Sequence, residues 1–295
     1  MITVDQLSQV GIGTSRVASL GSRMSSDTFM DFLTIANARG INLIDTADFY
    51  GSGDSERLIS KCLKETGFPF FVMTKAGLPC VHTPGWLSPL NQIGKKIKQR
   101  AGAKSNYTAA YLIDSVQKSN KRLGVEAADA LLLHEPSWDD LADADSWDGL
   151  ARIKQQGLAR YTGVSTNDVR VVEAGIRSGQ VDLVQTAITW KDNASDAIIA
   201  LCRANRIPVV ANQALQSYKS LQSVFDRQAD AIRQLTGLAD MTLVQLLIAA
   251  VLAQKKADVV LFGTSNPVHL AHNAESLRYV SSLASALPKI NQLLS

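Results

Sequence analysis

The sequence lacks the features that mark several large classes of protein. Its three cysteines, Cys62, Cys80 and Cys202, are odd in number and widely spaced, so we expect reduced thiols rather than a disulfide framework. The longest apolar run near the C-terminus, 246–253, is much shorter than the roughly 20 residues that span a bilayer. The N-terminus also lacks the basic and apolar regions of a signal peptide. These absences together predict a cytoplasmic protein without a membrane partner.

Metal-binding and nucleic-acid-binding patterns are missing as well. No spacing of histidine, cysteine and carboxylate residues resembles a zinc site, so His82, His269 and His272 are interpreted as surface or loop residues and no metal is expected. The net charge is only +3, and the one dense basic cluster, 95–104, is typical of a solvated helix or loop face. An anion site or a partner contact is the alternative for this cluster. No nucleic-acid partner is expected, and the oligomeric state stays open.

Short apolar runs alternate with helix-like segments along most of the 295 residues, a length that fits one large α/β barrel or two average domains. The expected strands are 10–13, 41–45, 70–74, 130–134, 160–164, 183–186, 208–211 and 259–262. The expected helices are 28–39, 54–65, 107–123, 147–156, 168–178, 195–205, 242–253 and 268–277. Eight such strand–helix units favour a closed parallel barrel, the (β/α)8 or TIM barrel, over an open sheet.

Two further features refine the expectation of a single α/β domain over residues 1–295. The first strand ends in Gly-Ile-Gly at 11–13 without the third glycine of a GxGxxG turn, which disfavours a Rossmann domain. The long segment 76–105 contains three prolines and shows no clear periodicity. Segments of this kind are usually functional lids or disordered insertions, and we expect this one to be a loop over the barrel mouth.

Three of the apolar runs end in, or are followed directly by, a side chain capable of acid–base chemistry. Asp45 closes one strand, Lys75 follows the next, and His134 closes the strand after that. Tyr50 lies five residues after Asp45, in the loop that follows it. A parallel barrel brings the C-terminal ends of all its strands to one rim, so the four side chains are expected to meet over one pocket.

The four groups together suit proton transfer. A tyrosine phenol, with an ordinary pKa near 10, is a poor acid or base at neutral pH, but a neighbouring ammonium such as Lys75 lowers that pKa. Asp45 is expected to hold Lys75 charged, and His134 to donate a hydrogen bond to a substrate oxygen. This combination fits protonation of the alkoxide that forms when hydride reaches a carbonyl, or the reverse oxidation of an alcohol. Taken singly, each residue also fits a structural role as a cap, a packing residue or a surface charge.

The segment 44–51, Ile-Asp-Thr-Ala-Asp-Phe-Tyr-Gly, followed by Ser-Glu at 55–56, resembles the signature opening of the aldo-keto reductase superfamily. Thr-Lys at 74–75 and Leu-His at 133–134 match the other catalytic positions of that family, and the resemblance extends over about 11–273. It implies an (α/β)8 barrel, a nicotinamide cofactor and a tetrad in which Tyr50 is the proton donor. The residues of that tetrad are Asp45, Tyr50, Lys75 and His134.

The resemblance also implies residues that bind the cofactor, NADP with NAD as a possibility. The segment 163–167, Gly-Val-Ser-Thr-Asn, resembles one whose serine and asparagine bind the nicotinamide carboxamide. This indicates Ser165, with Asn167 shifted by one position from the family pattern, and Gln185 completes the amide clamp.

The cofactor positions nearer the C-terminus depart from the family pattern. Asn212 stands where a tyrosine usually stacks on the nicotinamide, although Leu215 and Ser217 remain candidates to line the pyrophosphate. No arginine occupies the usual 2′-phosphate position, so the preference between NADP and NAD stays open. A helix after residue 266 is expected to offer backbone N–H groups to an anion. The resemblance to the adenosine-phosphate segment implies contacts from Gly263, Thr264, Ser265, His269 and Asn273.

Three functions remain open at this point. An NADP-dependent reductase of aldehydes or ketones is favoured, an NAD-dependent sugar or polyol dehydrogenase uses the same chemistry, and a cofactor-binding regulatory subunit with little turnover shares the fold. A small-molecule substrate is expected to meet Phe49, Trp86 and Trp190 as walls of a modest, open pocket. The identity of the carbonyl or alcohol does not follow from the sequence.

Overall fold

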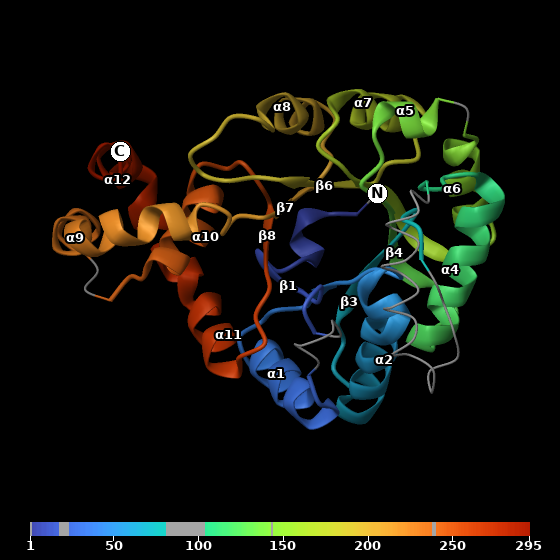
Figure 1. Ribbon diagram of the computed structural model, residues 1–295, viewed down its shortest axis with the longest axis horizontal. Helices are drawn as coiled ribbons and strands as arrows, with labels where there is room; N and C mark the ends of the chain where they lie inside the picture. The colour runs from blue at the N-terminus through green and yellow to red at the C-terminus, as the bar shows by residue number, and fades with distance from the viewer. Residues whose placement is uncertain (1, 18–23, 81–103, 143, 238–239) are drawn as a thin grey trace.

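Eight short apolar strands pair side by side in chain order, and the last pairs with the first to close a barrel (Figure 1). Every neighbouring pair is parallel. The computed structural model describes residues 2–17, 24–80, 104–142, 144–237 and 240–295. The (β/α)8 fold predicted from the alternation of strands and helices is confirmed. The strands are β1 (Val10–Gly13), β2 (Leu43–Asp45), β3 (Phe71–Ala76), β4 (Ala128–His134), β5 (Ala159–Ser165), β6 (Leu183–Ala187), β7 (Val209–Asn212) and β8 (Val259–Phe262).

All eight expected helices are present, with ends within about three residues of the expected bounds, and they surround the barrel (Figure 1). Several are capped by their own side chains; for example, the Ser25 hydroxyl accepts from the Thr28 N–H at the start of the first helix. These helices are α1 (Ser26–Ala38), α2 (Asp54–Thr66), α4 (Ala109–Leu123), α6 (Ser146–Gln155), α7 (Val169–Arg177), α8 (Asp196–Ala204), α10 (Leu243–Ala253) and α11 (Pro267–Ala274).

Among the described residues, three further α-helices were not predicted: α5 (Trp138–Leu141), α9 (Tyr218–Thr236) and α12 (Val280–Leu293). The last two pack against one another and against α10 on one side of the barrel (Figure 1). The described residues also form the short 3-10 segments η1 (Val4–Gln6), η2 (Tyr50–Gly53) and η4 (Glu275–Tyr279). Within the described residues, no helix is both long and apolar enough to cross a membrane.

The strand side chains alternate between an outer core beneath the helices and an inner core within the barrel. Ile2 and Leu7 from the N-terminal segment join the inner core, and Asn42, just before β2, donates to the Gln6 carbonyl at 2.9 Å. The N-terminal segment therefore closes the barrel at the N-terminal ends of the strands. The strand residues of the inner core are Leu43, Met73, Ala130, Leu132, Leu183, Val210, Val259 and Leu261.

The same alternation places the predicted site residues at the other end of the barrel. A residue two positions beyond an inward-pointing residue points inward as well, one layer nearer the C-terminal rim. His134, Ser165 and Gln185 also pair with one another in register across β4, β5 and β6, so they lie at one level. Two positions beyond members of the inner core lie Asp45, Lys75, His134, Gln185 and Asn212.

The predicted loop over the barrel mouth, 76–105, lies largely outside the described residues, because the description stops at residue 80 and resumes at residue 104. Trp86, a predicted wall of the substrate pocket, belongs to that part.

Candidate active site

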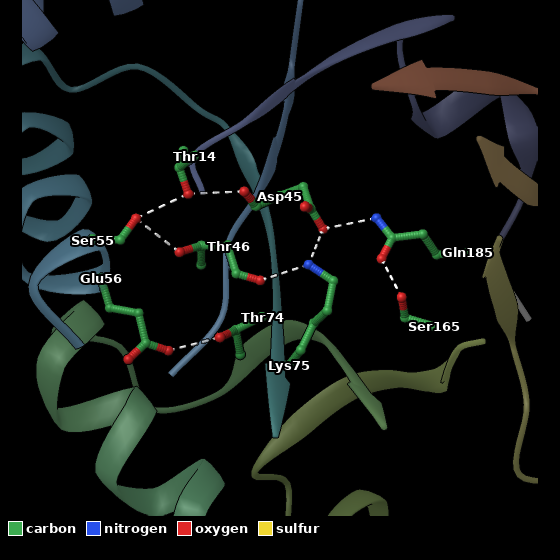
Figure 2. Close-up of polar contacts among 9 residues, drawn as sticks. All are labelled: Thr14, Asp45, Thr46, Ser55, Glu56, Thr74, Lys75, Ser165 and Gln185. Carbon is green, nitrogen blue, oxygen red and sulfur yellow. Dashed lines mark hydrogen bonds and ion pairs between the residues drawn. The ribbon is translucent and has the colours of Figure 1, made fainter. Parts of the chain in front are cut away.

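Asp45 and Lys75 form a buried ion pair at the C-terminal ends of β2 and β3. The Lys75 Nζ donates to Asp45 Oδ1 at 2.5 Å and to the Thr46 carbonyl at 2.9 Å (Figure 2). The side chains of Lys75 and Asp45 are only 2% and 7% exposed. Burial by itself lowers the pKa of Lys75, but the charges of Asp45 and Tyr50 outweigh it and raise that pKa above the ordinary value. Lys75 therefore remains an ammonium at neutral pH.

The ion pair connects to the next part of the rim through two further side chains. Gln185 Nε2 donates to the same Asp45 Oδ1 at 3.1 Å, and Ser165 Oγ donates to Gln185 Oε1 at 2.6 Å (Figure 2). Burial raises the pKa of Asp45, whereas the charge of Lys75 and the hydrogen bonds from Lys75 and Gln185 lower it. A continuous polar chain thus crosses the barrel interior from β3 to β5.

Tyr50 and His134 lie beside this ion pair. The Lys75 Nζ is 5.2 Å from the centre of the Tyr50 ring. The His134 ring meets Tyr50 edge-on with 5.7 Å between ring centres, and it meets Phe49 in the same manner at 6.0 Å. The structure therefore brings the four predicted tetrad residues together, with Phe49 as their neighbour.

The pKa of the Tyr50 phenol results from opposing influences. Burial raises it above its ordinary value of 10.0, Lys75 lowers it by its charge and by hydrogen bonding, and the charges of Asp45 and Glu135 raise it. The ammonium acts in the predicted direction, but burial outweighs it. Tyr50 is consequently a protonated phenol at neutral pH, with a cation in place to stabilise its anion.

The turn that carries Tyr50 is held by a second buried ion pair outside the barrel. Gly51, Ser52 and Gly53 all have left-handed backbone, with φ of 60°, 56° and 89°. Such conformations suit glycine but strain a serine, and strain of this kind often lies near functional sites. A Cβ on Gly53 would lie 2.6 Å from the Arg122 side chain, so only glycine allows this approach.

The partner of Arg122 is Glu56, whose side chain is fully buried. The Arg122 Nε donates to Glu56 Oε2 at 2.5 Å. Figure 2 shows the second bond of this carboxylate, in which the Thr74 hydroxyl donates to Glu56 Oε1 at 2.6 Å. Thr74 precedes Lys75 and faces the helices while Lys75 faces the barrel interior. The Glu56–Arg122 pair therefore joins α2, α4 and β3 directly behind the site.

Two cavities open near the C-terminal ends of the strands. One has a volume of about 680 Å³ and is lined by the predicted residues Ser165 and Asn167 together with Glu135 and Asn212, among others. Asn167 Oδ1 accepts from Thr186 Oγ1 and the Ala187 N–H, so only its NH2 group is left for a ligand. Glu135 and Asn212 were not predicted as site residues, although each lies at a strand end.

The second cavity, of about 970 Å³, adjoins the first at Gln213, which lines both. Arg16 and Lys219 line it as well and supply positive charge that the sequence analysis did not assign. The α11 N-terminus offers less than predicted, because Pro267 has no N–H and the Val268 N–H is taken by Asn266 Oδ1 at 2.9 Å. The predicted cofactor residues that line this cavity are Leu215, Gly263, Thr264, Ser265, His269 and Asn273.

Trp190 is placed differently from the prediction. It lines a separate cavity of about 400 Å³ with Leu287 and Pro288 of α12, and the Lys191 Nζ lies 5.6 Å from its ring centre. Trp190 is absent from the residues that line the two strand-end cavities described above. The structure therefore does not bring it to the predicted substrate pocket.

Two observations show that the described residues fit a nicotinamide dinucleotide. Two adjoining cavities that share Gln213 form an extended site, with amide and hydroxyl groups at one end and cations at the other. Within the described part of the chain, the buried oxygens Asn212 Oδ1 and Ser217 Oγ have no hydrogen-bond partner. Buried polar atoms of this kind are normally satisfied, so a ligand is an appropriate partner for them.

An acid, a phenol, an ammonium and an imidazole thus lie together at the C-terminal rim of this barrel. The family model described as "Aldo/keto reductase family" matches residues 9–292, and the chain belongs to that family. It is 25% identical over 291 residues to D-threo-aldose 1-dehydrogenase from a Pseudomonas species, with 90% of this chain and 88% of the relative covered. It is 24% identical to pyridoxine 4-dehydrogenase from Escherichia coli, with 97% and 96% covered.

Solved structures show the same fold. An aldo-keto reductase from Klebsiella pneumoniae in complex with NADPH superposes with a TM-score of 0.74 at 18% identity, with 98% of this chain and 91% of that chain covered. The holo form of an aldo-keto reductase from Bacillus halodurans gives a TM-score of 0.72 at 18% identity, with 98% and 93% covered. The protein is therefore an oxidoreductase of a family that uses nicotinamide cofactors on small carbonyl substrates.

Removal of the Lys75 charge tests the buried pair. Lys75→Met leaves Asp45 as an uncompensated buried carboxylate, and we expect the free energy of unfolding to fall by about 3–5 kcal/mol. The double variant Asp45→Asn/Lys75→Met should recover part of that loss. Urea unfolding measures the free energy of unfolding of the single and of the double variant. Lys118→Met, which breaks an exposed pair with Asp114 on α4, should cost under about 1 kcal/mol. A Lys75→Met protein as stable as the Lys118→Met protein would contradict a buried ion pair.

Proposed function

We propose that the protein transfers hydride between NADP(H) and an aldehyde, ketone or corresponding alcohol, with Tyr50 as the proton donor. The observation that carries this proposal is the buried Asp45–Lys75 ion pair beside the Tyr50 ring, with His134 against the same ring. A phenol between an ammonium and an imidazole has both a means to stabilise its anion and a neighbour to orient a substrate oxygen.

The residues of this chain divide the proton chemistry between them. In reduction, Tyr50 gives its proton to the oxygen of the carbonyl as that oxygen gains negative charge, and Lys75 stabilises the phenolate that remains. Asp45 keeps Lys75 charged, and the His134 imidazole fixes the carbonyl oxygen by hydrogen bonding. Oxidation of an alcohol uses the same groups in reverse. The cofactor, when bound, supplies or accepts the hydride.

Most of the residues that would hold the cofactor line the two strand-end cavities. Ser165 and Asn167 in the smaller cavity, with Gln185 bonded to Ser165, would bind the nicotinamide amide. Ser217, whose buried hydroxyl has no hydrogen-bond partner among the described residues, would line the pyrophosphate. The phosphates would lie in the larger cavity, where Arg16 and Lys219 provide the charge that the missing arginine would otherwise supply. A preference for NADP over NAD requires that one of these charges meet the 2′-phosphate. The remaining contacts proposed there come from Leu215, Gly263, Thr264, Ser265, His269 and Asn273.

A sugar or polyol dehydrogenase is the second candidate, because the lining of the smaller cavity is polar. Glu135, Ser137 and Asn212 offer acceptors and donors to several hydroxyl groups, which an apolar aldehyde would not use. The similarity to a protein named D-threo-aldose 1-dehydrogenase supports the same candidate. Turnover on a panel of simple aldehydes, aldoses and polyols distinguishes the two candidates.

Replacement of the phenol tests the role of Tyr50. Tyr50→Phe keeps the ring against His134 but removes the proton, so kcat should fall at least about a hundredfold while cofactor affinity stays within about twofold. Steady-state turnover and a fluorescence titration with NADPH measure the two quantities. Full turnover by the variant would remove Tyr50 from the proton-donor role. A wild-type protein that binds NADPH but turns over no substrate in the panel would favour a regulatory subunit instead.

The cofactor preference is tested at Lys219. Lys219→Gln removes one charge from the larger cavity, and the loss of one charge-assisted contact should weaken NADPH binding about tenfold. Titration with NADPH and NADH locates the contact: selective loss of NADPH affinity places Lys219 at the 2′-phosphate, and equal loss places it at the pyrophosphate. Lys118→Gln on exposed α4 is the matched control. Unchanged affinity for both cofactors would contradict the role proposed for Lys219.

A further inference from the structure

Gln185 reaches the Asp45–Lys75 pair from strand β6. Its Nε2 donates to Asp45 Oδ1, the same oxygen that accepts from Lys75, and its Oε1 accepts from Ser165 (Figure 2). Gln185 is 1% exposed and Ser165 is 3% exposed. The amide is therefore fixed at both of its ends in the barrel interior, and one end is fixed on a tetrad residue.

We propose that Gln185 is a positioning residue for proton transfer, which acts by holding the Asp45 carboxylate against Lys75. This inference rests on the proposed function, because the proton concerned is that of Tyr50. The two hydrogen bonds occupy one N–H and one lone pair of the amide, and one of each remains. The positioning role is thus additional to the amide clamp predicted for Gln185.

Gln185 acts on Tyr50 indirectly, because Gln185 and Lys75 donate to the same oxygen of Asp45. The Gln185 N–H stabilises the ionised form of Asp45, and without it the carboxylate depends on Lys75 alone. Asp45 then draws the shared proton toward itself, and less positive charge remains on Lys75. A weaker cation stabilises the phenolate less, so the pKa of Tyr50 rises.

The titratable groups that face Tyr50 come from three strands. Asp45 belongs to β2, Lys75 to β3 and His134 to β4, and Glu135 follows β4 directly. The Gln185 amide bonds to Asp45 and to Ser165, so its removal acts on the Asp45–Lys75 pair and leaves His134 and Glu135 in place. If the pKa of Tyr50 changes when this amide is removed, the change therefore comes from loss of the hydrogen bond between Gln185 and Asp45.

The test compares the wild-type protein with Gln185→Met, in which an apolar side chain of similar length removes the donor. At saturating oxidised cofactor and alcohol, kcat rises with pH as Tyr50 ionises. We expect the midpoint of that rise to lie at least about half a pH unit higher in the variant than in the wild-type protein. The ionisation of Tyr50 is also followed without cofactor, by ultraviolet absorbance. The signal of a Tyr50→Phe protein with the same residue at position 185 is subtracted, and the apparent pKa of Tyr50 should be higher in Gln185→Met than in the wild-type protein.

Asn120→Leu is the control for simple loss of a buried amide. Asn120 is 4% exposed, and its Nδ2 donates only to the backbone carbonyls of Glu126 and Leu158. Its replacement should lower the thermal unfolding temperature and leave the pH profile of kcat where it was. A shift that appeared equally in Asn120→Leu would show a general structural effect and overturn the proposal.

The remaining outcomes are also decisive. If the pH profile of kcat for Gln185→Met coincides with the wild-type profile and only the cofactor KM rises, Gln185 is an amide clamp alone and the proposal is overturned.

If Gln185→Met does not fold, Gln185→Glu replaces it. The carboxyl group of this variant donates to Asp45 only when it is protonated. Turnover should therefore approach the wild-type level at acidic pH and fall below it as the pH rises. If the ratio of kcat between Gln185→Glu and the wild-type protein is the same at every pH, the proposal is overturned. Absence of wild-type turnover instead refutes the proposed function, so the two failures are distinguishable.

Discussion

The ion pair between Asp45 and Lys75 is the interaction on which the site depends. Two opposite charges at 2.5 Å inside a barrel are costly to bury, and their attraction compensates for that cost only when further hydrogen bonds satisfy them. Thr46 and Gln185 supply these bonds, so the pair fixes the ends of β2, β3 and β6 relative to one another. In our proposal the same pair keeps a cation beside Tyr50, so one interaction serves both the fold and the chemistry.

The two faces of β3 show how the barrel supports such a charge. Lys75 points inward to Asp45, and its neighbour Thr74 points outward to Glu56, which is itself paired with Arg122. A buried ion pair therefore lies on each side of this strand. The outer pair also holds the turn that follows Tyr50, because Arg122 packs on Gly53. Movement of that turn is opposed from behind the barrel, at a distance from any substrate.

Much of the fold could be predicted from the sequence because strand and helix signals alternate so regularly. Of the three helices that were missed, the two longer ones, α9 and α12, were missed for different reasons. The α9 helix has buried residues Leu221, Phe225 and Ile232 at a helical spacing, a signal that was present but weak in a long polar stretch. The α12 helix contains Pro288 in its interior, which by itself argues against a helix, and packing against α9 and α10 overrides that preference.

The site was predictable where a polar residue breaks an apolar strand. The same rule indicates Asn212, two positions beyond the inward-pointing Val210, although the family pattern places an aromatic ring there. Arg16, Lys219 and the hydrogen bond between Gln185 and Asp45 could not be found in this way. Each depends on the closure of the barrel, which brings together residues far apart in the sequence; Gln185 and Asp45, for example, are 140 positions apart.

The measurement that tests the central claim most directly follows the hydride. NADPH that carries deuterium at the transferable position of its nicotinamide ring is incubated with the protein and an aldehyde or aldose substrate, and the alcohol product is analysed by mass spectrometry. If Tyr50 and its neighbours complete a hydride transfer by supplying the proton, the product carries one deuterium on the former carbonyl carbon and an exchangeable hydrogen on its oxygen. Oxidation of the cofactor without deuterium in the product, or no reaction with any carbonyl, would contradict the account.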